Sequence, residues 1–593
     1  MKTRNEIEEK YKWDLTTLCS SDEDFYAQYE LLKPYIEKFE NFEGKLNNKE
    51  TIKEYFSLSR EFEEKLFPVY LYADLKGDEI LSDNKRNQMR ETVHKFYSDF
   101  CVATTFVTNE FNDLSDEFLD ELIADTDFKD QDRFFMDIKR SKKHILSPQE
   151  EKLLAGMDFL GGFRTNMRKL TDADFDFGEV EDSKGNKLPL NHTTRMQYLR
   201  STDRTLRKNS AEKYSKVYAD HKNVLANNYI NHVKASCYLA KVRNYPSALA
   251  SSLEDDEIDS KVYDMNIEYV RKNIPMINRY YILKKKELGL DEIYGYDFFV
   301  EGANGKEEKI YSFEEAIELI KKALAPLGEE YIRLVDKAVV ERWIDVFPNK
   351  DKRTGGYCTG LCPQHPYILY NFDGSIHDVL GLAHELGHAM HTLFMTQTQA
   401  PEKRDYPLFL AEIASTTNEI LFLSYLLRSA RSDEEKKEVF NRLFSEVDAA
   451  IFAQTRLAEF EQKVHALCEE DVPLTKDVLA DIFAKLNEDY SGIVKSSENG
   501  QYGWSKIPHL YRDFYVFCYS TGMIAAIAFA NNILAEKEDA KEKYLNFLSL
   551  GDSVDPMTAL ALAGCDMRDE NTYTSCFEYL SSLLDQWEAL VGA

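Results

Sequence analysis

The chain has 593 residues, of which 104 are acidic and 74 basic, so its formal net charge at pH 7 is −30. Such a charge repels nucleic acid and anionic membrane surfaces, which bind clustered Lys and Arg side chains that this sequence does not show. We therefore expect neither nucleic acid nor a membrane among its partners. The length is sufficient for several domains, or for one large helical body with a lid.

Targeting signals and cysteine content predict a cytoplasmic protein. The first six residues turn acidic at once and lack the apolar core of a signal peptide. The most apolar stretch, Met523 to Ala530, is too short to span a bilayer. Nine cysteines are scattered without the paired spacings of a disulfide framework. Cys358 and Cys362 have metal-pair spacing, but no second pair completes a zinc site, so we interpret them as reduced thiols.

Amphipathic helices dominate the first 160 residues, and the stretches 22–42 and 51–71 are two examples. The pattern changes from Asp172 to Leu190, where apolar side chains alternate with acids. Within this stretch, residues 182–186 have the composition of a hairpin turn. A short β-hairpin is therefore predicted after the first helices.

The helical pattern returns near Thr193 and dominates to the carboxyl end. We place a domain boundary there, between a helical N-terminal lobe with its hairpin region (1–195) and a larger second domain (196–593). No flexible linker or internal repeat marks this boundary.

A glycine-rich loop and a strand precede the most informative helix. Gly355, Gly356 and Gly360 give a loop able to bend over a ligand, although two adjacent glycines are weak evidence alone. Tyr367 to Phe372 is rich in β-formers and ends at an Asp-Gly turn. We expect a strand whose edge could pair with an extended peptide backbone.

The segment from His384 to His388 reads H-E-L-G-H, a spacing that suits a metal-binding helix. Apolar residues recur around it at helical intervals, and Ser375 with Asp378 predicts the N-cap. Two histidines at i and i+4 share one face and can bind one Zn²⁺, while Glu385 can hold the water that the metal acidifies. The alternative is a buried helix that merely carries two histidines and an acid.

A third ligand decides between these alternatives, because a catalytic zinc has three protein ligands and one open position. A third histidine six residues after His388 is excluded, since position 394 is Phe. No acid lies about twenty residues after His388; the first one beyond is Glu412, on a helix predicted to begin near Pro407. Glu412 and Glu419 are seven residues apart on one face, so one can bind the metal while the other orients a histidine.

The segment after Pro508 could stabilise an oxyanion, which a metal alone does only in part. His509 is followed by Tyr511, Tyr515 and Tyr519 at intervals of four, which predicts one face of a helix. The competing interpretation is an aromatic packing stripe, which is the commoner use of such tyrosines.

These segments resemble oligoendopeptidase F, a bacterial relative of thimet oligopeptidase. That family carries H-E-x-G-H and, 24 residues after the second histidine, a glutamate in an A-E-x-A-S-T-x-N-E-type segment. The likeness extends over nearly the whole chain. It includes Trp13-Asp14-Leu15, the segments 352–358 and 365–369, Ile507-Pro508-His509, residues 519–522 and residues 551–556.

The resemblance implies a zinc metalloendopeptidase that hydrolyses internal bonds of short, unstructured oligopeptides with one Zn²⁺ per chain. The zinc ligands that it implies are His384, His388 and Glu412, with Glu419 orienting a histidine. The implied fold is mostly α: a large helical zincin-type body enclosing a deep channel, with a small β-sheet beside the zinc helix and a helical N-terminal lobe. Residues 196–593 would be the catalytic domain.

The catalytic side chains that the resemblance implies are Glu385 as general base and His509 with a tyrosine as oxyanion donors. Relatives often have Tyr-x-Tyr-x-Tyr here, whereas this chain has Phe517 between Tyr515 and Tyr519. Either tyrosine therefore stays a candidate.

Two other functions stay open. A carboxypeptidase would need a cation for the free carboxylate, for which Arg353 or Arg512 could serve. An inactive peptide-binding relative is disfavoured by the intact Glu385 and ligand set. The sequence does not predict the oligomeric state, the cleavage preference or the natural peptides.

Overall fold

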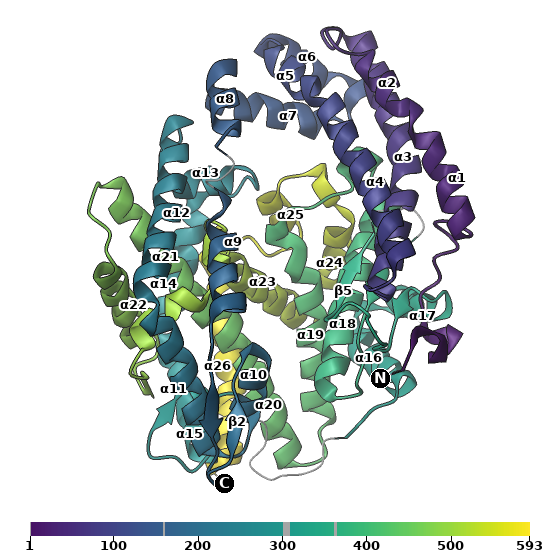
Figure 1. Ribbon diagram of the computed structural model, residues 1–593. Coiled ribbons are helices and arrows are strands. Elements are labelled where there is room, and N and C mark those ends of the chain that lie inside the picture. The colour runs from purple at the N-terminus through teal and green to yellow at the C-terminus, as the bar shows by residue number, and fades with distance from the viewer. Residues whose placement is uncertain (1, 158–160, 301–308, 361–364, 593) are drawn as a thin grey trace. The chain divides into compact units, whose positions relative to one another are not determined.

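The computed structural model describes residues 2–157, 161–300, 309–360 and 365–592 (Figure 1). Helices make up 72% of the chain and strands only 3%, which confirms a mostly α fold with small sheets. The chain forms two compact units. Unit 1 comprises Met1–Lys143, Glu308–Phe422 and Asn532–Gly564, and unit 2 comprises His144–Glu307, Leu423–Asn531 and Cys565–Ala593. These units are defined by residue packing. The predicted domain boundary at residue 195 comes from a change in the sequence pattern and stays a prediction.

Unit 1 contains most of the N-terminal helices and a three-stranded sheet. Its helices are α1 (Asp22–Leu32), α2 (Pro34–Glu40), α3 (Lys49–Glu79), α4 (Asn84–Ala103), α5 (Thr105–Asp113), α6 (Asp116–Ala124), α7 (Asp132–Ser141), α16 (Phe313–Leu324), α17 (Glu329–Val340), α18 (Ile376–Thr398), α24 (Ala540–Ser549) and α25 (Pro556–Leu562). Its strands are β4 (Ile344–Asp345), β5 (Tyr357–Thr359) and β6 (Tyr367–Leu369).

Unit 2 is helical apart from two pairs of short strands. Its helices are α8 (Pro148–Ala155), α9 (Phe163–Arg168), α10 (His192–Arg200), α11 (Arg204–Asp220), α12 (Lys222–Val242), α13 (Ala248–Glu254), α14 (Ser260–Lys272), α15 (Ile274–Glu287), α20 (Asp433–Val447), α21 (Gln454–Glu469), α22 (Lys476–Tyr490) and α26 (Glu570–Gly592). Its strands are β1 (Glu179–Glu181), β2 (Lys187–Pro189), β3 (Ile293–Tyr294) and β7 (Val494–Lys495). Two helices have residues in both units: α19 (Leu408–Ser429) and α23 (Phe517–Leu534).

The first predicted helix is wrong as a single element, because the stretch 22–42 forms α1 and α2. The break falls before Pro34, which has no backbone N–H to continue α1 but suits the first turn of α2. The second predicted helix is α3, which is longer than expected and continues through Pro68. The predicted hairpin is confirmed by antiparallel pairing of β1 with β2, from Glu179 opposite Pro189 to Glu181 opposite Lys187.

The three-stranded sheet has the order β4-β6-β5, with β6 parallel to β4 and antiparallel to β5. The predicted strand is therefore central rather than at an edge, which corrects our expectation of a free edge at residues 367–372. Tyr367 and Leu369 of β6 are fully buried and pack into a core cluster with residues of α1–α4. This packing fixes the sheet that leads into α18.

Helix α23 is long and apolar enough to cross a membrane, whereas the stretch Met523 to Ala530, judged from the sequence, is too short. However, 72% of its apolar window is buried inside the protein, as is usual for a core helix. Among the described residues, α23 alone meets these criteria.

Candidate metal centre

Helix α18 positions two of the predicted ligands. Its N-cap is the predicted one, since the Ser375 hydroxyl accepts the Asp378 N–H at 3.1 Å. One turn separates His384 from His388, and their Nε2 atoms lie 3.2 Å apart. Two ring nitrogens this close point at a common site.

Glu412 of α19 completes a triangle with these nitrogens. Its Oε2 atom lies 3.4 Å from His384 Nε2 and 3.5 Å from His388 Nε2. A tetrahedral Zn²⁺ with ligand bonds of 2.0–2.1 Å would separate its ligand atoms by about 3.3 Å. The donor set and its spacing therefore fit a zinc ion. No other group of three His, Cys, Asp or Glu side chains within the described ranges converges as closely.

Helices α18 and α19 lie side by side (Figure 1), and a glycine of α18 allows their close approach. A Cβ atom at Gly387 would lie 2.5 Å from the Ser415 Cα and 2.7 Å from the Ala414 carbonyl oxygen. Only glycine leaves room for backbone at that distance. Because Glu412 lies one turn before Ser415, this close crossing sets its distance from the histidines.

Glu419, the second acid of α19, lies beside the His384 ring on the side opposite the metal triangle. Glu419 Oε1 lies 3.1 Å from His384 Nδ1, so the ring can donate there while Nε2 faces the triangle. The geometry thus separates the two acids that the sequence left interchangeable. Burial lowers the pKa of His384, but Glu419, with smaller effects of Glu385 and Glu412, outweighs it and raises that pKa to about 9. Burial raises the pKa of Glu412, but the histidines lower it to about 2.

Glu385 follows the first histidine and is only 9% exposed. Its Oε2 atom is buried and has no hydrogen-bond partner in the described part of the chain. Burial raises the pKa of this carboxyl group, against the opposing effect of His384 and His388. A carboxyl group with a spare oxygen and a raised pKa suits a general base.

The glycine-rich loop passes beside this carboxylate. A Cβ atom at Gly356 would lie 3.3 Å from Glu385 Oε1 and 2.8 Å from the Tyr370 ring. The Asn371 amide donates to the carbonyls of Arg353 and Gly355, at 3.0 and 2.7 Å. Tyr370 and Asn371 belong to the predicted strand 367–372 but directly follow β6 in the structure, and sequence reasoning assigned them no role beside the site.

The free edge of the sheet belongs to β5. The N–H groups of Ile368 and Tyr370 donate to carbonyls of Trp343 and Asp345, so residues 367 and 369 face β5. Their partners are Thr359 and Tyr357. By alternation, the N–H and C=O of Cys358 point to the other side, where no strand of the described residues pairs with β5.

The other predicted catalytic residues lie in unit 2. The ring centre of His509 is 6.4 Å from that of Tyr515 and 6.2 Å from that of Tyr519, and the two tyrosine hydroxyls are 3.1 Å apart. Partial burial lowers the pKa of His509, and the guanidinium groups of Arg164 and Arg168 add to this effect. Either tyrosine hydroxyl stays a candidate donor.

The predicted tyrosine face is wrong in one respect, because Tyr511 and Tyr515 precede α23 rather than belonging to it. The backbone reverses at Phe514, whose φ is +51°. Tyr511 points elsewhere: its hydroxyl accepts the Asn228 amide at 2.9 Å, and its ring packs on Tyr229.

Buried charged side chains hold the backbone at Phe514 in this conformation. The sequence did not predict their roles. The Phe514 N–H donates to Glu461 Oε1 at 2.8 Å, and Glu461 is fully buried on α21. Asp513 Oδ1 lies 2.8 Å from His232 Nε2 and 3.7 Å from His465 Nε2. These partners are separated by 48 to 281 residues, which leaves no local pattern, so no sequence signal could have found them.

Three remaining expectations concern Cys358, Arg353 and Arg512. Cys358 is unpaired in β5, and Cys362 lies outside the described residues. Arg353 forms an ion pair with Asp78 at 2.9 Å, so its charge is already matched. The Arg512 guanidinium lies 4.7 Å from the ring centre of Tyr515.

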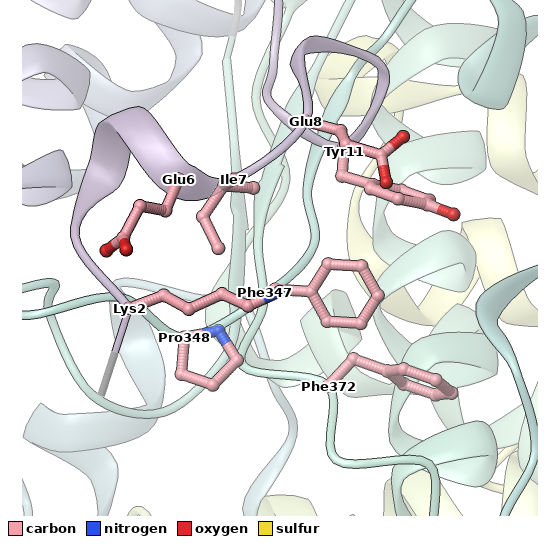
Figure 2. Close-up of a pocket in the computed structure, with 8 residues that line it drawn as sticks. All are labelled: Lys2, Glu6, Ile7, Glu8, Tyr11, Phe347, Pro348 and Phe372. Atoms are coloured by element: carbon pink, nitrogen blue, oxygen red, sulfur yellow. The ribbon is translucent and has the colours of Figure 1, made fainter.

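Unit 1 also contains a cavity of about 350 Å³ that none of the metal ligands lines (Figure 2). None of the predicted site residues lines it. Its lining residues are Lys2, Glu6, Ile7, Glu8, Tyr11, Phe347, Pro348 and Phe372. The metal centre is therefore distinct from this cavity.

Comparison with protein families gives two matches. The model of peptidase family M3 matches residues 197–579, and that of oligopeptidase F matches residues 110–177. The gap between them includes residue 195, where composition predicts a boundary.

Curated relatives match over nearly the full length. The group B oligopeptidase PepB of Streptococcus agalactiae is 33% identical over 99% of this chain and 98% of its own. The oligopeptidase PepF of Bacillus subtilis is 31% identical, with 99% and 88% covered.

Solved structures agree with these matches. A crystal structure from Chlamydophila abortus has a TM-score of 0.94 at 31% identity and covers 99% of this chain and 100% of its own. The oligoendopeptidase-F of Enterococcus faecium has a TM-score of 0.73 at 28% identity, with 96% and 99% covered.

Proposed function

Since the chain belongs to peptidase family M3 and is a metalloendopeptidase, we propose that it uses one zinc ion to hydrolyse internal bonds of short, unstructured oligopeptides. The observation that carries this proposal is the triangle of His384, His388 and Glu412, with edges of 3.2–3.5 Å. Glu419 supports it by fixing the ring of His384.

A zinc ion held by this triangle would acidify a water molecule and polarise the carbonyl group of the scissile bond. Glu385 accepts the proton of the attacking water, because its buried Oε2 has no hydrogen-bond partner among the residues that the structure describes. It then passes that proton to the leaving amine. The raised pKa of Glu385 suits both transfers, since it makes the carboxylate a stronger base toward the water proton.

His509 and one of Tyr515 and Tyr519 donate to the oxyanion that forms on the carbonyl oxygen. The two hydroxyls are within hydrogen-bonding distance of each other, at 3.1 Å, so one can hold the other in place. The lowered pKa of His509 keeps its ring neutral, with one N–H available as donor. These roles are part of the proposal.

The substrate is an extended peptide that pairs with the free edge of β5. The N–H and C=O of Cys358 would bond the peptide backbone, whatever its side chains. A three-residue edge can accept only a chain that is already extended, which excludes bonds inside folded domains. The deep channel and the cytoplasmic location belong to the same proposal. The eight described cysteines form no disulfides with one another, which agrees with that location.

Glu385→Gln tests the mechanism. The variant should keep its zinc and bind peptide, but lose roughly 100- to 10,000-fold in turnover because an amide cannot take the proton. Glu402→Gln, a carboxylate of unit 1 that pairs with Arg60, is the matched control. Turnover of an internally quenched peptide by Glu385→Gln within about tenfold of the parent would refute the assignment.

Blocked peptides separate endopeptidase from carboxypeptidase activity. A peptide acetylated and amidated at its ends should be cut internally, as mass spectrometry of the products would show. Stepwise loss of C-terminal residues from the free-acid peptide alone would favour the carboxypeptidase.

A further inference from the structure

Two cations of unit 2 lie together without an acidic partner. Arg195 is on α10, and its guanidinium carbon lies 4.4 Å from the ring centre of Tyr214. Lys506 ends a 3₁₀ turn, and its Nζ lies 5.9 Å from the same ring centre. No carboxylate in the described ranges pairs with either cation.

Their polar contacts leave both charges unbalanced. Lys506 Nζ donates to the Ser215 hydroxyl at 2.7 Å, and Arg195 Nη1 contacts the Met196 sulfur at 3.7 Å. The Nε atom of Arg195 is buried and has no hydrogen-bond partner among the described residues. Buried cations are normally paired, because an uncompensated charge is costly to remove from water.

The electrostatics agree with this shortage of negative charge. Burial, with a smaller effect of Arg195, lowers the pKa of Lys506 to about 7. Burial also lowers the pKa of Arg195. A bound anion would oppose both shifts. In a chain with a net charge of −30, acids are plentiful, so two unmatched cations indicate a site for a ligand rather than a lack of partners.

The surroundings indicate from which side an anion arrives. Ser215 borders a cavity of about 410 Å³ whose charged lining residues are Glu179, Glu181, Glu212, Glu498, Lys213 and Lys216. Acids outnumber bases there, which disfavours an anion. Near His509, three residues after Lys506, the charges are those of Arg164 and Arg168 on α9. Positive charge near His509 would attract an anion.

We propose that Arg195 and Lys506 form a carboxylate-binding site for the peptide substrate. The inference rests on the proposed function, because every oligopeptide carries a terminal carboxylate. The site lies in the same unit as His509, Tyr515 and Tyr519. The carboxylate can be the C-terminal one or that of an Asp or Glu side chain, and the test distinguishes them.

The test compares three peptides of one sequence: a free acid without acidic side chains, its C-terminal amide, and an amide with one glutamate. The KM of each is measured for the parent, Lys506→Met, Arg195→Met and the conservative Lys506→Arg. Lys485→Met, which removes a surface lysine paired with Asp489 in the same unit, controls for the loss of one charge.

The parent should bind the preferred carboxylate peptide roughly 10- to 100-fold more tightly than the plain amide, as for a hydrogen bond between charged groups. That preference should fall to near unity in both methionine variants, while Lys506→Arg and Lys485→Met retain it. Preference for the free acid identifies the terminal carboxylate, and preference for the glutamate peptide identifies the side chain. Equal KM values for all three peptides in the parent, or an unchanged preference in the methionine variants, would overturn the proposal.

A binding measurement separates this inference from the proposed function. Labelled versions of the three peptides are titrated into Glu385→Gln protein with and without Lys506→Met, and fluorescence anisotropy reports the Kd. Carboxylate-dependent binding without hydrolysis by the parent would contradict the proposed function but uphold the site. Hydrolysis by the parent together with carboxylate-independent binding would contradict the carboxylate site but uphold the proposed function.

Discussion

Gly387→Ala probes the close approach that forms the metal centre. The new Cβ would lie 2.5, 2.7 and 2.8 Å from three backbone atoms of Ala414 and Ser415. Backbone atoms cannot turn away as a side chain would, so α18 and α19 must separate or the mutated turn must distort.

The size of the required shift follows from these distances. An ordinary contact begins at 3.4 Å, so the closest atom must retreat by 3.4 − 2.5 = 0.9 Å. Glu412 is one turn away on the same helix and moves with it. Zinc ligands tolerate deviations of only about 0.2 Å, so this carboxylate would leave the triangle. We expect zinc affinity to fall by about 100-fold or more, together with an overpacking cost of about 1–3 kcal/mol.

Gly381→Ala is the matched control on the same helix. Its Cβ would lie 2.1 Å from the Tyr370 hydroxyl, which is the end of a side chain that can move. This variant should keep its zinc. Elemental analysis after dialysis against a chelator measures both proteins. If Gly387→Ala retained zinc with parental affinity, the crossing at Ser415 would not be what positions Glu412.

Other substitutions test single roles. Glu412→Ala should lose zinc, whereas Glu419→Ala should weaken its affinity about 10- to 100-fold, as chelator competition would measure, because it only orients His384. His509→Ala should keep its zinc but lose roughly 100- to 1,000-fold in turnover, and parental turnover would transfer the donor role to a tyrosine. Burial raises the pKa of Glu63 to about 7 from 4.5, so the folded state is penalised as pH rises between these values and fully above 7. Glu63→Gln should therefore leave the thermal midpoint unchanged below about pH 4.5 and raise it above pH 7, by the equivalent of about 2 kcal/mol after allowance for partial exposure. Glu64→Gln is the control, and equal pH profiles in scanning calorimetry would contradict the effect.

Local spacing was enough to predict the parts of the site that lie on one element. His384 and His388 share a face because of helix geometry alone, and Ser375 caps that helix as its sequence indicates. The same local reasoning missed the break before Pro34, although a proline is a direct signal for it.

The rest depends on contacts between distant segments. Whether Glu412 or Glu419 faces the triangle is set where α19 crosses α18 at Gly387, and no spacing within α19 encodes that. The central place of β6 depends on pairing with β4, more than twenty residues earlier. The reversal at Phe514 is held by Glu461, 53 residues away, so a helical repeat of tyrosines could not predict it.

The alternation of β5 has a consequence for where peptides are cut. Within β5, Cys358 alone presents its N–H and C=O to the open side of the sheet, so a peptide that pairs antiparallel to β5 makes both backbone bonds through one residue. N-methylation of that residue removes its donor, and a methyl scan along a peptide should find a single sensitive position for each cleavage. Because side chains repeat every two residues along an extended chain, a peptide that slips along this edge keeps its side chains facing the same way only in steps of two. Cleavage sites in a peptide of two alternating residue types should then fall at every second bond.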